Sequence, residues 1–456
     1  MRQLLALLFV LSLGIQACGP RQLEPPFVCQ KKSQSDAASP EDSLKLNSEA
    51  DFIDIRSGRV FYWFVPAEND DGKKPFTVWL HGGLGESGLV PMFLGNGPYR
   101  LNPGSGRYRL NSDLSLYANE ASWHKFSNML YIDQPVGVGL SQTSLPLART
   151  LGEVAIDVYN VIRKFLISHP AMAARDFYLF GDGFAGSVIP HVAKTIVTNP
   201  ALGFKNLKGI GIGGGTIDLA SHWHTLPEFA FEAGLISPQE TDFATRFLAA
   251  TCELDRRAYL ARGIVQIPPS CEVLVGYVKN AANTPFLGDY RRMFDYSDEM
   301  SAMECYLNAP EVLRFIKFRS DEPFRVKNPA VFKALTGTEL ESQTANIRTI
   351  LNGGIKVLIF GGMTDMYVNP LGLRFWADEF ASDTPESWAD AQDFREQAFD
   401  YWQQGKEQLG QFRAGGGLTV VFLDNAGQLV SKDVPMAAQT MFSQFINRDN
   451  EGVRNQ

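Results

Sequence analysis

Short runs of apolar residues recur along the chain and predict buried β-strands. They are rich in valine, isoleucine, leucine and aromatic residues without alternating polar positions, as in strands covered on both faces. These runs occupy residues 76–80, 129–132, 177–180, 210–212, 356–360 and 418–422. Two further β-rich runs, 52–55 and 60–65, flank a turn at Ser57 and Gly58 near the start of the pattern.

An amphipathic helix is predicted between the second and third buried runs. Its apolar positions are Val154, Val158, Ile162 and Phe165, which are three or four residues apart and fall on one face of a helix. Strands that alternate with such helices predict an α/β fold, with a doubly wound, mostly parallel central sheet.

The stretch from 218 to 335 lacks strand patterns and is predicted to be helical and irregular. We expect it to be a cap inserted over the carboxyl ends of the strands, where ligands bind in such folds. The fold core would then consist of residues 51–217 and 336–456. The length of 456 residues, 45% of them hydrophobic, suits one large core with an insertion or two ordinary domains.

Residues 1–17 are predicted to be a signal peptide. Arg2 precedes an apolar run from 4 to 15, which is too short to cross a bilayer. The run ends in a sequence similar to a bacterial lipobox, in which Cys18 would be acylated; an ordinary signal cut near Ala17 is the alternative. The polar stretch 18–50 is predicted to be a flexible tether. The protein is therefore expected to be exported, as a periplasmic or outer-membrane lipoprotein, or otherwise secreted.

The charge of the chain limits the classes of partner that we expect, and its cysteines predict disulfide bridges. A net charge of −8 and the absence of long Lys/Arg runs argue against nucleic acid, and leave a lipid anchor at Cys18 as the expected membrane contact. Export permits disulfides. Cys29, Cys252, Cys271 and Cys305 allow three pairings, and a bridge within 252–305 is expected because three of the four lie there. The sequence leaves the oligomeric state open.

Residues 177–191 predict a strand that turns sharply into a helix, with Gly183 at the corner. The turn is similar to the G-x-S-x-G nucleophile elbow, but Gly183 has no side chain that could attack a substrate. In α/β-hydrolases the catalytic histidine follows the last core strand. The second half of this chain has no histidine, since the six are His81, His124, His169, His191, His222 and His224.

Several ordered motifs together resemble those of serine carboxypeptidases of the α/β-hydrolase fold, most closely the vitellogenic-like branch. The resemblance covers about residues 50 to 447. It rests on Val78-Trp79-Leu80-His81-Gly82-Gly83-Leu84-Gly85, Asp133-Gln134-Pro135-Val136-Gly137, Gly181-Asp182-Gly183-Phe184-Ala185-Gly186, Cys305-Tyr306-Leu307-Asn308-Ala309-Pro310, Gly362-Met363-Thr364-Asp365 and Asn425-Ala426-Gly427-Gln428.

The resemblance implies a triad of serine, aspartate and histidine, of which only Asp365 is retained. Gly183 takes the serine position and Gln428 takes the histidine position. A glutamine amide is not a base near neutral pH. Loss of both groups is expected to leave no covalent turnover.

The resemblance also implies binding groups. The backbone amides of Gly83 and Phe184 would converge as an oxyanion hole. Trp79, His81, Gly82 and Asp182 correspond to positions that hold the substrate's terminal carboxylate. A family glutamate is replaced by Gly95, so the paired carboxylic acids are expected to be missing, although a protonated His81 could attract an anion.

Other polar residues give weaker signals. Ser87, Ser141 and Ser187 lie near the predicted mouth of the pocket, but none is at the corner of the elbow. His222 and His224 would lie on one face of a strand and could bind a metal, but no cysteine or carboxylate accompanies them at ligand spacing. We therefore expect no metal and no cofactor.

The leading hypothesis is an exported, catalytically inactive homologue whose pocket binds a peptide C-terminus or a small acyl ligand. One alternative is a working hydrolase with a non-standard catalytic group, for example a water held by Asp365 and Gln428. Another is a structural or interaction protein that acts through its cap.

Overall fold

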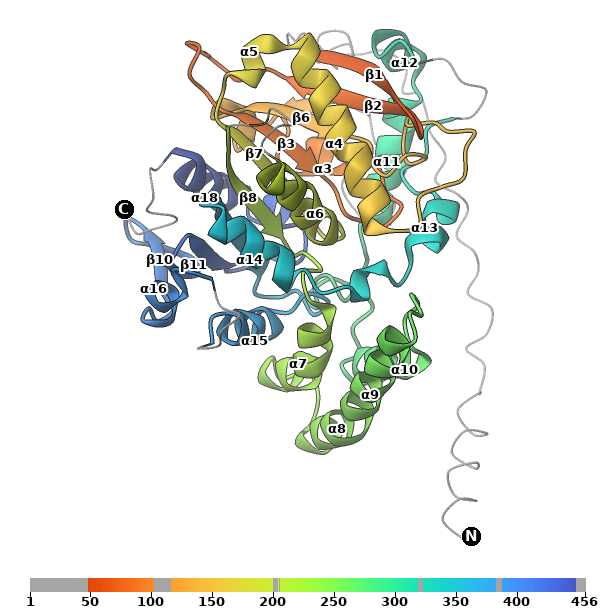
Figure 1. The fold of residues 1–456 in the computed structure, drawn as a ribbon. Helices are drawn as coiled ribbons and strands as arrows, with labels where there is room; N and C mark the ends of the chain where they lie inside the picture. Colours follow the sequence, from red (N-terminus) through yellow and green to blue (C-terminus); the bar gives the residue numbers. More distant parts are fainter. Residues whose placement is uncertain are drawn as a thin grey trace.

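A computed structural model describes residues 48–101, 116–199, 204, 206–318, 323–382 and 388–447. Its centre is a ten-stranded sheet in the order β1-β2-β6-β3-β7-β8-β9-β12-β11-β10 (Figure 1). The six inner strands are mutually parallel. They are β6 (Asn128–Ile132), β3 (Phe76–Leu80), β7 (Phe177–Asp182), β8 (Leu207–Gly213), β9 (Lys356–Gly362) and β12 (Leu418–Leu423). The predicted mostly parallel sheet is confirmed.

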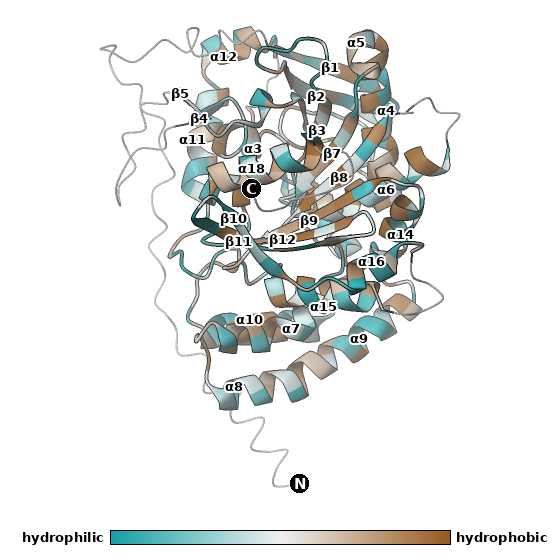
Figure 2. Ribbon diagram, turned by 90° about the vertical axis from the view of Figure 1, so that its left-hand side faces the viewer, coloured by the Kyte–Doolittle hydropathy of each residue, from teal (hydrophilic) through white to brown (hydrophobic). Residues whose placement is uncertain are grey.

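At both edges of the sheet, the outer strands run antiparallel to their neighbours. β1 (Glu49–Ile55) and β2 (Gly58–Val65) form the predicted hairpin, and β1 includes the last two residues of the predicted tether. At the other edge, β11 (Glu407–Gly415) and β10 (Asp400–Gln404) were not predicted. Only Trp402 of β10 is buried, so this edge strand lacks an apolar run and is teal in Figure 2. β4 (Tyr99–Leu101) and β5 (Leu116–Ala118) form a separate hairpin.

Helices cover both faces of the sheet (Figure 1). On one face pack α4 (Leu151–Ser168), α6 (Ala185–Thr198), α14 (Thr344–Asn352), α15 (Pro370–Phe380) and α16 (Ala391–Arg395), with α5 (Pro170–Ala173) following α4. The opposite face is covered by α3 (Val90–Leu94), η1 (Trp123–Lys125), α11 (Ser297–Leu307), α12 (Pro310–Phe315), α17 (Val430–Asp433) and α18 (Pro435–Asn447).

Helix α4 is the amphipathic helix expected from the sequence. Val154, Val158, Ile162 and Phe165 are all buried in the core. A capping box fixes its start, because the Thr150 side chain accepts from the backbone N–H of Glu153 while the Glu153 carboxylate accepts from that of Thr150.

The segment between β8 and β9 is helical in its described part. It includes α7 (Leu219–Glu232), α8 (Pro238–Phe243), the π-helical η3 (Ala244–Ala249), α9 (Ala250–Ala261), α10 (Pro269–Ala281), α13 (Pro329–Leu335) and the short turn η4 (Thr338–Leu340). Helices α7, α9 and α10 share a separate apolar cluster. A disulfide joins Cys252 to Cys271, which confirms the expected local bridge. Cys18, Cys29, the signal peptide and nearly all of the tether lie outside the described residues.

The strand prediction for His222 and His224 is wrong, because both lie in α7. His222 is buried with its Nδ1 3.2 Å from the Asn369 carbonyl, whereas His224 is exposed and contacts the Phe375 ring. Two residues at this spacing point about 200° apart around a helix, so they do not share a ligand. Among the described helices, none combines the length and the apolar character needed to cross a membrane.

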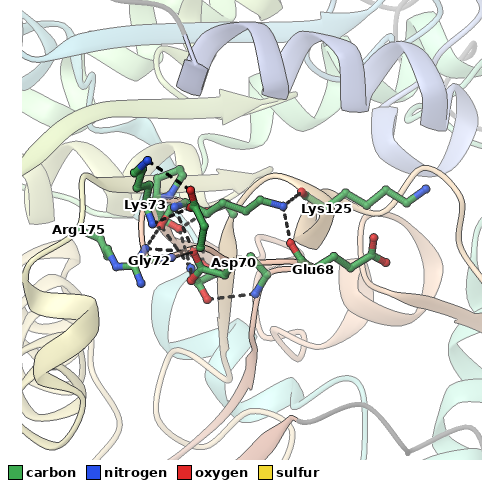
Figure 3. A network of polar contacts seen from close by, with 12 residues as sticks. Glu68, Asp70, Gly72, Lys73, Lys125 and Arg175 are labelled. Carbon is green, nitrogen blue, oxygen red and sulfur yellow. Dashed lines mark hydrogen bonds and ion pairs between the residues drawn. The ribbon is translucent and has the colours of Figure 1, made fainter.

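A polar network ties together the amino ends of three core strands (Figure 3). Asp70 Oδ1 accepts from the backbone N–H groups of Gly72 and Lys74 at 3.0 and 3.2 Å, and from the Arg175 guanidinium at 3.1 Å. Its Oδ2 accepts from the Asn128 side chain at 3.1 Å. Lys74 precedes β3, Asn128 is the first residue of β6 and Arg175 precedes β7. The network therefore fixes the amino ends of these strands, and the candidate site lies at their carboxyl ends.

Candidate functional site

The candidate site forms where the parallel strands end. His81 follows β3, Gly183 follows β7, Asp365 lies three residues after β9 and Gln428 follows β12. Parallel strands place their carboxyl ends at the same edge, which explains why residues so distant in the sequence meet there.

Two adjoining cavities open at this edge. The larger, about 1150 Å³, lies between the ends of the strands and the inserted helical segment, and the smaller has about 110 Å³. Both are lined by Gly82, Gly83, Gly183, Phe286, Asp295 and Gln428. Of the predicted site residues, Phe184 also lines the larger cavity, and His81 and Asp182 line the smaller.

Gly183 occupies a corner that has no room for a side chain. Its φ is +55°, a conformation that favours glycine, and its N–H donates to the Gly213 carbonyl at 3.0 Å. A Cβ atom at this position would lie 2.1 Å from the carbonyl oxygen of Gly82. The backbone conformation therefore favours glycine, and a Cβ would fit only if the Gly82 carbonyl moved.

The predicted oxyanion hole is not open in this structure. The Phe184 N–H donates a 2.6 Å hydrogen bond to the Gly82 carbonyl, so it is not a free donor. Gly82 packs directly on the corner, because a Cβ on Gly82 would lie 2.1 Å from the Phe184 nitrogen. The prediction that Gly83 and Phe184 present two convergent amides is therefore wrong for this conformation.

His81 lies between two carboxylates. Its Nδ1 is 2.7 Å from Asp182 Oδ1 and its Nε2 is 3.3 Å from Glu86 Oε2. Burial opposes a charge on the ring, but the two carboxylates outweigh burial and raise the pKa of His81 to about 10. The imidazolium is already paired, so it does not present a free positive charge to an anion, contrary to the sequence-based expectation.

Glu86 is a site residue that the sequence analysis missed. It lines the smaller cavity and forms a 2.8 Å ion pair with Lys327. Burial opposes its ionisation, but His81 and Lys327 together lower its pKa. Glu86 and Asp182 flank one cavity, but both contact His81; that the family's pair of carboxylate-binding acids is missing, with Gly95 in place of one glutamate, stays a prediction. The signal available in the sequence was an acidic residue in the glycine-rich loop after the 76–80 strand.

Asp365 is buried behind the cavities and lines neither of them. Its Oδ1 accepts from the Tyr367 and Val368 N–H groups at 2.9 and 3.1 Å, whereas its Oδ2 has no hydrogen-bond partner among the described residues. Burial raises the pKa of Asp365 to about 8, so the carboxyl is largely protonated at neutral pH.

Gln428 reaches the same place from the loop after β12. A Cβ built on Gly214 would lie 3.4 Å from Gln428 Cγ and 3.5 Å from Asp365 Oδ2, so the two side chains are neighbours. The described residues show no hydrogen bond between them. The Gln428 N–H donates to the Gly288 carbonyl at 2.7 Å, which fixes the loop.

Trp79 does not line either cavity, which corrects its predicted binding role. It is buried in the core with its ring centroid 5.0 Å from that of Trp123. The three candidate serines are also structural: Ser87 Oγ donates to the Asp133 carboxylate, Ser141 Oγ to the Asp133 carbonyl at 2.7 Å, and Ser187 Oγ to the Thr216 carbonyl at 2.8 Å.

A second carboxylate that the sequence did not reveal, Glu339, lies on the wall of the larger cavity. Burial raises its pKa to about 7, with a hydrogen bond from Tyr367 acting in the opposite direction. No motif marks Glu339 in the sequence, since only the fold brings η4 to the cavity.

Comparisons with known proteins agree with this architecture. Residues 40–448 match the family described as serine carboxypeptidase. A pheromone-processing carboxypeptidase KEX1 of Phytophthora infestans is 29% identical over 87% of this chain and 67% of its own length. Serine carboxypeptidase-like 49 of Arabidopsis thaliana is 29% identical over 86% of this chain and 74% of its own. The crystal structure of KEX1ΔP, a prohormone-processing carboxypeptidase from Saccharomyces cerevisiae, superposes with a TM-score of 0.75 at 21% identity, covering 89% of this chain and 93% of that one.

Proposed function

The chain belongs to the serine carboxypeptidase family, and we propose that it binds a peptide or small acyl ligand in the pocket at the elbow without hydrolysing it. The observation that carries this proposal is Gly183 at the corner of the elbow. Covalent catalysis needs a nucleophile there. A glycine whose Cβ position is filled by the Gly82 carbonyl offers none.

The two residues that could stand in for a catalytic base support the same proposal. Gln428 stands where the resemblance places the histidine, and its amide does not accept a proton near neutral pH. His81 is the one histidine that lines either cavity at the elbow. Since its pKa is raised to about 10, it already carries its proton at neutral pH and is not a general base there.

A hydrolase that uses a water held by Asp365 and Gln428 fits the structure less well. Such a water needs a basic group beside it. Asp365 lies outside both cavities, and a carboxyl with a pKa of about 8 is mostly protonated at pH 7.

Activity-based labelling tests the proposal. The purified protein is incubated with a serine-directed fluorophosphonate, and with peptides that have free or blocked C-termini and with esters, beside an active serine carboxypeptidase as control. We expect no adduct and no product above that of a mock purification. A covalent adduct on a residue of this chain, or a rate that Asp365→Ala abolishes, would refute the proposal.

One surface feature favours interaction through the cap as a second function. Phe243 and Phe247 are exposed, with ring centroids 5.6 Å apart, and the Phe243 ring contacts Tyr277 at 5.3 Å. Exposed aromatic clusters often mark binding surfaces. If the cap carries the function, Phe243→Ser with Phe247→Ser will abolish partner binding and leave ligand binding at the elbow unchanged.

Export is part of the proposal. It is supported by the predicted signal peptide and by the Cys252–Cys271 disulfide, which is typical of an oxidising compartment. Mass spectrometry of the mature N-terminus tests the lipid anchor: acylated Cys18 would support it, and an unmodified start would leave an ordinary secreted protein.

A further inference from the structure

Glu339 is a buried carboxylate with an incomplete set of partners. Its side chain lies in η4, and the residue is 8% exposed. The Tyr367 hydroxyl donates to Oε1 at 3.5 Å, which is the outer limit for a hydrogen bond. No other side-chain hydrogen bond or ion pair to Glu339 is found in the described part of the chain. The residue nevertheless lines the larger cavity together with Gly183 and Gln428.

Burial of an unpaired carboxylate is unfavourable and favours its protonated form. Burial raises the pKa of Glu339 to about 7, and the single hydrogen bond from Tyr367 does not offset it. At neutral pH the group is close to half ionised. A cation placed beside it would supply the missing partner and favour the ionised form.

The other charged residues around the cavity do not provide a cationic partner for Glu339. Lys279 of α10 lines the same cavity but forms no ion pair with Glu339 within the described residues. Asp295, also on the cavity wall, is exposed and is itself an acid, and Asp365 lines neither cavity. In the adjoining small cavity, the positive charges of His81 and Lys327 are already paired with carboxylates.

The remaining wall is apolar and aromatic. Phe286, Leu287 and Phe332 line the cavity, and Met293 and Phe294 lie on its rim, 70% and 68% exposed. Large apolar side chains gathered at a cavity of this size are typical of a surface that receives an apolar ligand. The cavity thus combines an apolar wall with one buried acid.

We infer that the larger cavity binds an organic cation, namely a primary ammonium or guanidinium group attached to an apolar chain or ring. Glu339 pairs with the cation, and Phe286, Phe294 and Phe332 contact the apolar part. The inference rests on the proposed function, because it names the chemical class that the non-hydrolytic pocket selects. It differs from the expected recognition of a terminal carboxylate, for which this edge presents no unpaired buried cation in the described residues.

Three matched probes test the inference in the full chain. Dansylcadaverine carries an ammonium group, its N-acetyl derivative is neutral, and N-dansyl-6-aminohexanoate carries a carboxylate, while the aromatic body is shared. Binding is measured at pH 8 by fluorescence titration. Wild type is expected to bind the ammonium probe at least about tenfold more tightly than the neutral one, as for a charge-assisted hydrogen bond in a dry site.

Glu339→Gln is expected to remove this selectivity while it leaves the affinity for the neutral probe unchanged. The neutral probe therefore reports that the variant is folded and the cavity intact. Glu341→Gln is the matched control, since Glu341 lies two residues on, is more exposed and pairs with His191 at 2.9 Å. It should leave the selectivity unchanged.

The pH dependence gives a second readout. In wild type the ammonium probe should bind more weakly as the pH falls through 7, because Glu339 becomes protonated, and this dependence should be absent in Glu339→Gln. Tyr367, Lys279 and Asp295 line the same cavity; burial raises the pKa of Tyr367, so its hydroxyl stays protonated between pH 6 and 8.

Equal affinity of wild type for the ammonium and neutral probes, preference for the carboxylate probe, or selectivity that survives Glu339→Gln would overturn the inference. None of these results bears on catalysis. Conversely, hydrolysis of a peptide or ester would refute the proposed function without changing the probe selectivity, so the two failures are distinguishable.

Discussion

Gly183 and Gly82 are locked against each other at the corner between β7 and α6. A side chain at position 183 must adopt a φ of +55° and displace the Gly82 carbonyl, which would be 2.1 Å from the new Cβ. Position 183 therefore lacks a side chain, and the Gly82 carbonyl also occupies the space that a Cβ would need.

Gly183→Ser is expected to lower the free energy of unfolding by about 2–5 kcal/mol, from backbone strain of about 1–2 and overpacking of about 1–3 kcal/mol. Gly263→Ser is the matched control, since Gly263 has a φ of +67° and no atom within 4 Å of its Cβ position. It should lose only the strain. Urea denaturation of both variants checks this, and equal losses would contradict the crowding argument.

Gly183→Ser with Gln428→His should remain inactive, because the Phe184 amide stays bonded to Gly82.

His81 makes stability depend on pH. Its folded-state pKa of about 10 is above the ordinary value of 6.5, so the folded state holds a proton that the unfolded state releases in this interval. The resulting stabilisation is complete below pH 6.5 and is lost as the pH rises to 10, by at most about 1.4 kcal/mol per pH unit.

His81→Gln should remove this part of the pH dependence. At pH 7 it should also destabilise the protein by roughly 3–5 kcal/mol, because Asp182 is left buried without its cation and Glu86 keeps only Lys327. Denaturation curves between pH 6 and 10 measure both effects. The exposed His224→Gln is the control. An unchanged slope in His81→Gln would show that another group titrates.

The buried strands and the helix α4 were predictable, because their apolar periodicity directly reflects burial in the core. Strands β10 and β11, the last two at one side of the sheet, were not, since their few buried residues stand among polar ones and form no apolar run. The edge of the sheet where the site lies was predictable from strand order. The contacts of His81 with Glu86, and of Gly82 with Phe184, depend on loop conformations that residue types alone do not specify.

We expect Asp70 to contribute strongly to the stability of the protein through the loop before β3. Asp70→Ala removes four hydrogen bonds in a half-buried network that joins β3, β6 and β7, and is expected to cost about 2–4 kcal/mol. The adjacent Asp71 is more exposed and forms a surface ion pair with Lys73 at 3.5 Å. Asp71→Ala should cost less than about 1 kcal/mol. Thermal denaturation compares them, and similar losses would argue against a special role for the network.

At the scale of the whole molecule, the fold of the family is present, while positions 183 and 428 hold glycine and glutamine. The sheet, the cap and the cavity at the strand ends are those of an α/β-hydrolase, and the family assignment covers residues 40–448. Within this frame, the charges at the site pair with one another at His81, Glu86 and Lys327, and one acid, Glu339, faces the larger cavity. Under the proposed function, these cavities enclose a ligand that the protein does not cleave.

A single-turnover experiment in H₂¹⁸O tests this account most directly. The protein, in molar excess, is incubated with peptides that end in a free carboxylate, and the products are followed by mass spectrometry beside an active serine carboxypeptidase. The account predicts that every peptide is recovered whole, without ¹⁸O, after the control has consumed its substrate. Release of the terminal residue with ¹⁸O in the new carboxylate, at a rate that follows the protein through purification, would contradict it.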